Sequence, residues 1–335
     1  MIFIENEGIT DPRVNLALEE YALRNFPARD YLLFYINEPS IIIGRNQNTL
    51  EEINLSYVEE NNIHVVRRVS GGGAVYHDFG NLNFSFITNH DVKSLNNFLK
   101  FTQPVINILN SIGVAAELKG RNDIVVNDRK ISGNAQFSTG KRMFSHGTLL
   151  LDSDLDEVTR ALNVKMSKII SKGHKSVRSR VANISEFLPE PMDIHHFRSL
   201  ILKGLYQEQP DFETYHLSPD EWKAVHKLKE EKYATWDWNY GSSPKFNIQR
   251  SKRFPIGEID LRIFVEKGHI ESLRIFGDFF GKEPMESLEL LLQGKRYDRE
   301  EISEALEPVV IEDYFGALPK EDFLDLLYGE DLPYL

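Results

Sequence analysis

The chain has 335 residues, of which 41% are hydrophobic and 27% charged, a composition typical of a globular protein with room for about two domains. Its net charge of −12, from 39 basic and 51 acidic residues, disfavours a polyphosphate partner and so argues against nucleic-acid binding. The absence of cysteine excludes disulfides, thiolate metal sites and a thioester intermediate on the chain itself.

The first residues, MIFIENEGITDPR, lack the basic and apolar regions of a secretory signal, and no apolar run reaches the roughly 18 residues of a membrane span. We therefore expect a cytoplasmic protein with no membrane partner. Asp11 followed by Pro12 is typical of a helix start. Apolar residues then recur at helical spacing: Val14, Ala17, Leu18, Tyr21 and Ala22.

Short β-rich runs follow this predicted helix. They cover residues 31–37, 40–46, 63–69, 82–88, 123–127 and 144–152. One longer helical stretch, from about 92 to 112, interrupts them, with Pro104 as a kink or boundary. Because strands and helices mix without regular βαβ alternation, we predict an α+β fold with mainly antiparallel or mixed sheets and flanking helices.

The second half of the chain is predicted to be helical from about 155 to 232 and then to change character. A Gly-Ser-Ser-Pro stretch at 241–244 is typical of a linker. Beyond it, alternating apolar residues on both sides of a turn at 267–268 predict a β-hairpin: Ile259, Leu261, Ile263 and Val265, then Leu273 and Ile275. We therefore predict one domain over 1–247 and a small α+β domain, with short helices after the hairpin, over 248–335.

The stretch VVRRVSGGGAVYHD, residues 65–78, places three glycines after two arginines. Gly71, Gly72 and Gly73 can adopt positive φ and let another group approach the backbone amides. Arg67 and Arg68 add fixed positive charge suited to a carboxylate or phosphate. A glycine-rich bulge between paired strands is an equally good explanation of the glycines alone. Neither the P-loop nor the Rossmann fingerprint is present.

Two further clusters contain residue types that are common in active sites. In GRNDIVVNDRKISGNAQ, residues 120–136, Lys130 follows a predicted Asn-Asp turn, although a lysine after a turn is by itself usually a solvated charge. In MFSHGTLLLD, His146 lies in a strand-like run, where a single histidine is more often structural than catalytic. The serine-hydrolase motif GxSxG is excluded, because Met143 occupies the position of its first glycine, two residues before Ser145.

Taken together, these clusters resemble a known family. The segments RRVSGGGAVYHDFGNLNFSF, GRNDIVVNDRKISGNAQF and FSHGTLLLD, in this order and spacing, resemble the two-domain form of lipoate-protein ligase, and SKGHKSVRSRVANISE at 171–186 matches a further segment. The resemblance implies a catalytic domain over 1–247, related in fold to biotin-protein ligases and class II aminoacyl-tRNA synthetases, and an accessory domain over 248–335. It also implies activation of lipoate by ATP to lipoyl-AMP, then transfer to a lysine of lipoyl-domain proteins, namely 2-oxoacid dehydrogenase E2 subunits, or of the glycine cleavage H protein.

The same resemblance implies roles for individual residues. Lys130 would be the catalytic residue and would contact both the adenylate and the lipoyl group. The other implied ATP and adenylate contacts are Arg68, Gly73, Ala74, Val75, Tyr76 and Asp123. The other implied lipoate contacts are Gly71, Gly72, Gly73, His77 and His146. Asp123 would also hold Mg²⁺, and no cofactor would be permanently bound. Ser145 departs from the pattern, because some relatives carry a second histidine there.

The chemistry agrees with this implied activity. Attack of a carboxylate on a phosphate brings two anions together, so cations such as Arg68 and Lys130 suit its transition state. One alternative is a lipoyltransferase that uses preformed lipoyl-AMP or a lipoylated donor protein, and another is a non-catalytic adenylate-binding sensor. Biotin ligation is disfavoured, because the loop reads RRVSGGG and not GRGRxG.

Overall fold

The protein is described by a computed structural model that covers residues 1–91, 93–162, 180–207, 211–240, 248–266, 268–297 and 299–328. The chain divides into two compact units. The first comprises Met1–Ile43, Leu50–Val69 and Ala74–Asn239, and the second Gly44–Thr49, Ser70–Gly73 and Tyr240–Leu335. The linker expected at 241–244 lies outside the described residues. The domain boundary at 247 stays a prediction.

The first unit is built on an eight-stranded mixed sheet with the order β11-β1-β2-β6-β10-β9-β8-β7. Its strands are β1 (Ile2–Ile4), β2 (Tyr31–Tyr35), β6 (Asn81–Asn89), β7 (Glu117–Lys119), β8 (Asp123–Val126), β9 (Arg129–Ser138), β10 (Arg142–Leu150) and β11 (Thr214–Tyr215). The β11–β1 and β1–β2 pairs are parallel, whereas the pairs from β2 to β7 are antiparallel. The predicted α+β fold with mixed, mainly antiparallel strands is confirmed.

The arginine-glycine motif, residues 67–73, begins at the last residue of β4 in a three-stranded sheet with the order β4-β3-β5. Its strands are β3 (Ser40–Ile43), β4 (His64–Arg67) and β5 (Val75–His77), and the short helices α2 (Thr49–Glu52) and α3 (Leu55–Glu60) connect β3 to β4. β3 pairs in parallel with β4 and antiparallel with β5. The chain between β4 and β5 is a loop, so the glycines do not form a bulge within a paired strand.

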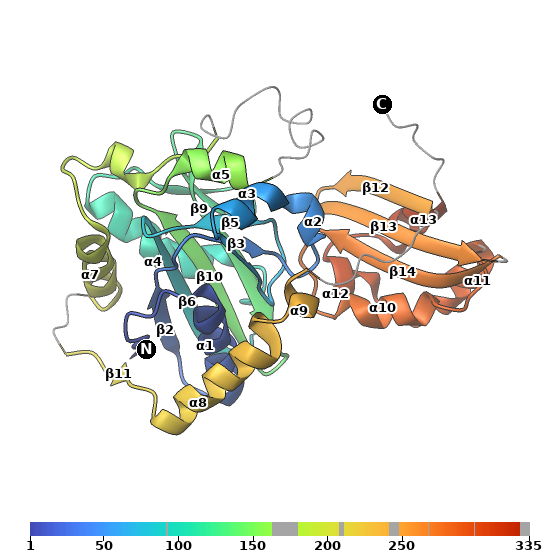
Figure 1. Ribbon diagram of the computed structural model, residues 1–335, viewed down its shortest axis with the longest axis horizontal. Coiled ribbons are helices and arrows are strands. Elements are labelled where there is room, and N and C mark those ends of the chain that lie inside the picture. Colours follow the sequence, from blue (N-terminus) through green and yellow to red (C-terminus); the bar gives the residue numbers. More distant parts are fainter. Residues whose placement is uncertain are drawn as a thin grey trace. The chain divides into compact units, whose positions relative to one another are not determined.

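Helices cover both faces of the large sheet. Figure 1 shows α1 (Pro12–Asn25) and α8 (Pro219–Leu228) side by side on one face, where both contribute to one apolar cluster. On the other face, α4 (Phe98–Ser111) and α7 (Ile194–Leu205) enclose a second cluster. The shorter elements are α5 (Leu155–Ala161), the 3₁₀ helix η2 (Ile184–Phe187), the π-helical η3 (Lys229–Tyr233) and α9 (Trp236–Asn239).

The start of α1 is as predicted, whereas that of α4 is not. Asp11 caps α1 by accepting a hydrogen bond from the backbone N–H of Arg13, and Pro12 is the first helical residue. The helix expected from 92 begins at Phe98, because the Asn97 side chain accepts from the backbone N–H of Lys100 and sets the start there. Pro104 lies inside α4 and does not end it.

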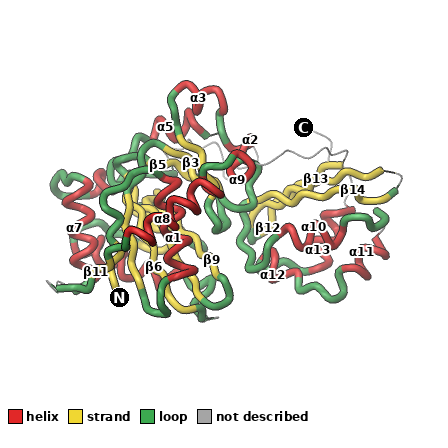
Figure 2. Tube along the Cα trace, turned by 60° about the horizontal axis from the view of Figure 1, so that its bottom comes forward, coloured by secondary structure: helices red, strands yellow, loops and turns green. Residues whose placement is uncertain are grey.

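The second unit contains the predicted hairpin and one strand that the prediction missed. β13 (Gly257–Glu266) and β14 (His269–Gly277) form the hairpin, and β12 (Ile248–Phe254) pairs with β13 along its other edge. Within the described part of this unit, four helices follow, α10 (Met285–Leu292), α11 (Arg299–Ala305), α12 (Ile311–Phe315) and α13 (Lys320–Tyr328). Figure 2 shows these helices on one face of the sheet, and their apolar residues form one cluster with Ile259, Leu261 and Ile263. Among the described residues, no helix combines the length and apolar character needed to span a membrane.

Candidate active site

Lys130 lies at the start of β9, and the local fold directs its side chain. Asn127 and Asp128 both have positive φ, 50° and 64°, and form the tight turn that joins β8 to β9. Lys130 pairs with Val125 and Ser132 with Ile124, so one extra residue is inserted on β9 between these pairs. Because of this bulge, Lys130 and Gly133 share one face of the sheet, although residues three apart in a regular strand do not.

The ammonium group of Lys130 is held above Gly133 by an ion pair. Lys130 Nζ lies 2.8 Å from Asp123 Oδ1, and Asp123 is the residue opposite Gly133 in the strand register. A Cβ atom on Gly133 would lie only 2.9 Å from this Nζ, so glycine provides the space for the lysine. The side chains of Lys130 and Asp123 are 34% and 39% exposed, which leaves the charged pair accessible to a ligand.

The backbone of Lys130 is fixed by a fourth segment of the family motif. The N–H of Lys130 donates to the carbonyl of Arg180 at 2.6 Å, and the N–H of Ala182 donates to the carbonyl of Lys130 at 2.9 Å. Residues 171–179 of this segment lie outside the described residues. Both the N–H and the carbonyl of Lys130 are therefore hydrogen-bonded, which places its side chain on a rigid element.

Replacing Gly133 by alanine should slow the lipoate activation and lipoyl transfer that the family resemblance implies by roughly tenfold or more, because the new methyl group displaces the Lys130 ammonium from its position. The control is Gly140→Ala, at a hairpin tip where a Cβ atom would meet nothing within 4 Å. Thermal unfolding should show both variants folded. Wild-type rates for Gly133→Ala would mean that the position of the lysine over Gly133 does not matter for catalysis.

His146 is not an isolated strand histidine but half of a buried pair. It lies on β10, and its Nδ1 is 3.0 Å from each carboxylate oxygen of Glu19 on α1. The two side chains are only 9% and 2% exposed. Sequence reasoning missed Glu19, although an acidic residue among the apolar positions of an amphipathic helix is a signal, because a buried carboxylate needs a partner.

Arg68 is a buried cation beside this pair. Its backbone N–H donates to the carbonyl of Ile43 at 2.9 Å and its Nη1 to the carbonyl of Ile42 at 3.0 Å. Burial lowers the pKa of Arg68 to about 10, against the opposing effect of Tyr35 and Glu19, so the guanidinium stays charged at neutral pH. A buried positive charge of this kind suits an anionic ligand.

Arg67, the other arginine of the motif, serves a different purpose. Its backbone N–H donates to Asn239 Oδ1 at 2.9 Å and its Nε to the carbonyl of Trp238 at 2.9 Å. Arg67 therefore anchors α9 on β4. Arg68 interacts electrostatically with Glu19, the partner of His146.

β5 provides the remaining predicted contacts of the first unit. Val75, Tyr76 and His77 are its three residues, with Ala74 directly before them. Burial raises the pKa of the Tyr76 phenol. His77 is 4% exposed, and burial, with Arg68 and His146 nearby, lowers its pKa to about 3, so its imidazole is neutral at physiological pH.

The three glycines of the sequence motif, Gly71, Gly72 and Gly73, belong to the second unit and differ in the space around them. Gly72 has a φ of 94°, in the region that favours glycine, and its carbonyl oxygen occupies the place that a Cβ atom on Gly44 would need. A Cβ atom on Gly71 would overlap the carbonyl oxygen of Phe279. A Cβ atom on Gly73 would meet nothing within 4 Å, so Gly73, unlike Gly71, has open space at this position.

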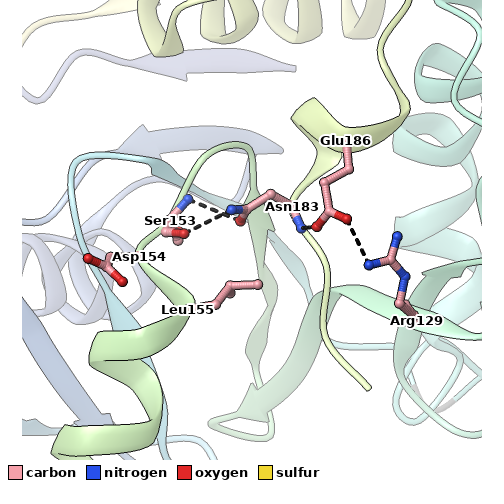
Figure 3. Close-up of a pocket in the computed structure, with 6 residues that line it drawn as sticks. All are labelled: Arg129, Ser153, Asp154, Leu155, Asn183 and Glu186. Atoms are coloured by element: carbon pink, nitrogen blue, oxygen red, sulfur yellow. Dashed lines mark hydrogen bonds and ion pairs between the residues drawn. The ribbon is translucent and has the colours of Figure 1, made fainter. Parts of the chain in front are cut away.

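One pocket of about 400 Å³ lies elsewhere in the first unit (Figure 3). Its lining residues are Arg129, Ser153, Asp154, Leu155, Asn183 and Glu186, none of which is a predicted site residue. The only cation among them, Arg129, is paired with Glu186 at 2.7 Å. Because that charge is already neutralised, we assign no ligand to this pocket.

The first unit contains two cationic side chains of the kind used by enzymes that activate a carboxylic acid, the buried Arg68 and the partly exposed Lys130. Arg68 and Lys130 carry the positive charge that a carboxylate and a phosphate require, and neither position involves a thiol. These features agree with the adenylate-forming ligase class that the sequence motifs imply.

Comparisons with known proteins agree with this class. The family of the lipoyl protein ligase A/B catalytic domain matches residues 11–206, and that of the bacterial lipoate protein ligase C-terminus matches residues 243–327. Lipoate-protein ligase LplJ of Bacillus subtilis is 58% identical over 331 residues, which cover 98% of this chain and 100% of LplJ. The chain therefore belongs to the lipoate-protein ligase family.

The solved structures that are similar to this protein include two that contain a bound small molecule. The crystal structure of P. falciparum LipL1 in complex with lipoate has a TM-score of 0.76 at 28% identity and covers 97% of each chain. The crystal structure of lipoate-protein ligase A bound with ATP has a TM-score of 0.59 at 31% identity and covers 69% of this chain and 94% of the other. The predicted family and ligase class are confirmed, whereas the roles of individual residues stay predictions.

Proposed function

We propose that this enzyme activates free lipoate with ATP to lipoyl-AMP and then transfers the lipoyl group to a specific lysine of an acceptor protein. The proposed acceptors are apo lipoyl domains and the glycine cleavage H protein. The observation that carries the proposal is the accessible Lys130 ammonium, held by Asp123 above Gly133 on a rigid strand. The lipoate-bound and ATP-bound relatives support the choice of substrates.

In the first step, a carboxylate oxygen of lipoate attacks the α-phosphorus of ATP. A new P–O bond forms, the bond to the β-phosphate oxygen breaks, and pyrophosphate leaves. Arg68 and Lys130 reduce the repulsion between the two anions and stabilise the charge on the phosphoryl oxygens. The buried guanidinium of Arg68 is effective here, because low solvent exposure strengthens its field.

In the second step, the neutral amine of the acceptor lysine attacks the carbonyl carbon of the mixed anhydride. The C–N bond forms, AMP leaves with the electrons of the C–O bond, and the nitrogen releases one proton to solvent water. The Lys130 ammonium stabilises the negative charge that develops on the carbonyl oxygen. The absence of cysteine agrees with direct transfer from the adenylate to the acceptor.

The site provides few protein ligands for Mg²⁺. No group of three or more metal-binding side chains occurs in the part of the chain that the structure describes. A Mg²⁺ ion commonly binds through one or two carboxylates together with substrate phosphates, and Asp123 would supply one carboxylate oxygen. The metal would provide additional positive charge at the phosphates.

The proposal is tested by incubating the enzyme with an apo lipoyl domain and measuring the mass of the domain. We expect the mass of one lipoyl group to be added when both ATP and lipoate are present, and nothing when either is omitted. Modification only from synthetic lipoyl-AMP would select the lipoyltransferase alternative. Modification from a lipoylated donor protein alone would also select the lipoyltransferase, and no modification from any of these sources would select the adenylate-binding sensor.

A further inference from the structure

A chain of buried amide side chains runs through the first unit and ends at His77. Asn6 precedes α1, Asn15 lies on α1 and Asn37 follows β2. All three side chains are at most 4% exposed, as is His77. Each contacts the next within hydrogen-bonding distance: 3.2 Å from Asn6 to Asn15, 2.9 Å from Asn15 to Asn37 and 3.0 Å from Asn37 to His77.

The direction of these hydrogen bonds follows from groups that can only donate or only accept. The backbone N–H of Gly8 donates to Asn6 Oδ1, so Asn6 Nδ2 is the atom that donates to Asn15 Oδ1. The carbonyl of Ile9 can only accept, and Asn15 Nδ2 donates to it at 2.9 Å. The same Asn15 Nδ2 also donates to Asn37 Oδ1. Two independent backbone groups therefore fix the orientation of both amides.

The orientation of Asn37 decides where the proton of His77 lies. Since Asn37 Oδ1 accepts from Asn15, the atom that faces His77 Nδ1 is Asn37 Nδ2, which can only donate. His77 Nδ1 must therefore carry a lone pair. A neutral imidazole has one ring proton, so in His77 that proton is on Nε2.

Nε2 of His77 is buried and has no hydrogen-bond partner among the described residues. A buried N–H without a partner is costly, and such a group in a functional region is a place for a ligand acceptor. Arg68 and His146 lie near enough to influence the His77 ring electrostatically, which places Nε2–H in the same buried polar region.

We propose that Asn15 and Asn37 are positioning residues that hold His77 as its neutral Nε2–H tautomer, so that this N–H donates a hydrogen bond to an oxygen of the bound acyl substrate. The identity of that substrate as lipoate rests on the proposed function. One consequence is that His77 cannot be the base that removes the proton from the acceptor lysine, because its lone pair is on Nδ1 and is used by Asn37. An aspartate at position 37 would have the opposite effect, because a carboxylate draws the proton onto Nδ1.

The tautomer is measured on ¹⁵N-histidine-labelled enzyme by long-range ¹H–¹⁵N correlation at neutral pH without substrate. The signal of His77 is assigned as the one that disappears in His77→Gln. We expect Nδ1 to have the chemical shift of an unprotonated nitrogen and Nε2 that of a protonated one. A protonated Nδ1 in the wild-type enzyme would overturn the proposal.

The role of Asn37 is tested by Asn37→Asp, with Asn83→Asp as the matched control. Asn83 is equally buried, but its side chain donates to the carbonyl of Tyr35 and accepts from Asn81. We expect His77 Nδ1 to become protonated in Asn37→Asp and to remain unprotonated in Asn83→Asp. An unchanged Nδ1 in folded Asn37→Asp would show that Asn37 does not set the tautomer.

The hydrogen bond to substrate is tested by calorimetric binding of lipoate to His77→Gln and His77→Asn. The glutamine amide reaches the place of Nε2–H, whereas that of asparagine reaches only the place of Nδ1. We expect Kd to rise about tenfold in His77→Asn, as for the loss of one hydrogen bond to a charged group, and to rise less in His77→Gln. Equal losses in both variants would contradict a specific donor at Nε2.

These measurements are independent of catalysis. The enzyme could show the expected tautomer of His77 and bind lipoate, yet fail to activate it. That result would contradict the proposed function and leave the role of the amides intact. Normal lipoate activation with a protonated Nδ1 would contradict the role of the amides alone.

Discussion

Replacing Lys130 by methionine should slow lipoate activation and lipoyl transfer each by about 10²- to 10³-fold, the typical loss for one oxyanion-stabilising donor. Methionine keeps the length of the side chain but removes its charge. The variant therefore lacks the cation that reduces the repulsion between carboxylate and phosphate and stabilises the carbonyl oxyanion. Circular dichroism should remain native, because the lysine side chain is 34% exposed and its ion pair contributes little to stability.

The matched control is Lys119→Met. Lys119 lies on β7 and pairs with Asp128, and both side chains are more than half exposed. We expect this variant to retain wild-type rates. Loss of activation with normal transfer from lipoyl-AMP would confine Lys130 to phosphate binding, and wild-type rates in both assays would make it a surface lysine.

Replacing Gly72 by valine should abolish lipoyl-AMP formation and leave the protein folded. The φ of 94° at this position is strained for a β-branched residue, so the loop between β4 and β5 would have to change its path. This loop joins Arg68 to Val75 and Tyr76, so a change of path would disturb both ends of the predicted adenylate contact. Formation of lipoyl-AMP is measured directly by mass spectrometry of the quenched reaction.

Gly140→Val separates this effect from the general cost of backbone strain. Gly140 has a φ of 80° and open space around it, and it lies at the β9–β10 hairpin tip, where no site residue is predicted. We expect this control to form lipoyl-AMP at the wild-type rate. Activity in Gly72→Val, or loss of activity only through unfolding, would assign a purely structural role to the glycine.

Elements with strong local signals were predictable from the sequence. The cap at Asp11 with Pro12 defined α1, and period-two alternation with a turn defined β13 and β14. β12 was missed because its sequence, IQRSKRF, places Arg250 and Lys252 opposite the core residues Leu261 and Ile259. A polar edge strand of this kind has no alternating pattern to detect.

The candidate site was predictable where its residues are close in the sequence. Asp123 and Lys130 belong to one hairpin, so their motif already places them together. Glu19 and His146 are 127 residues apart and meet only because α1 packs on the sheet, which no local pattern indicates. Asn15 and Asn37 were missed for the same reason, because their contacts depend on the packing of α1 against the chain after β2.

Exchange of pyrophosphate into ATP tests most directly the claim that this enzyme activates lipoate itself. Labelled pyrophosphate is incubated with ATP, Mg²⁺ and the wild-type enzyme, with and without lipoate. We predict that label enters ATP only when lipoate is present, because formation of lipoyl-AMP is reversible and releases pyrophosphate. Exchange that is absent, or that does not depend on lipoate, while transfer from synthetic lipoyl-AMP proceeds, would contradict the assignment as a ligase.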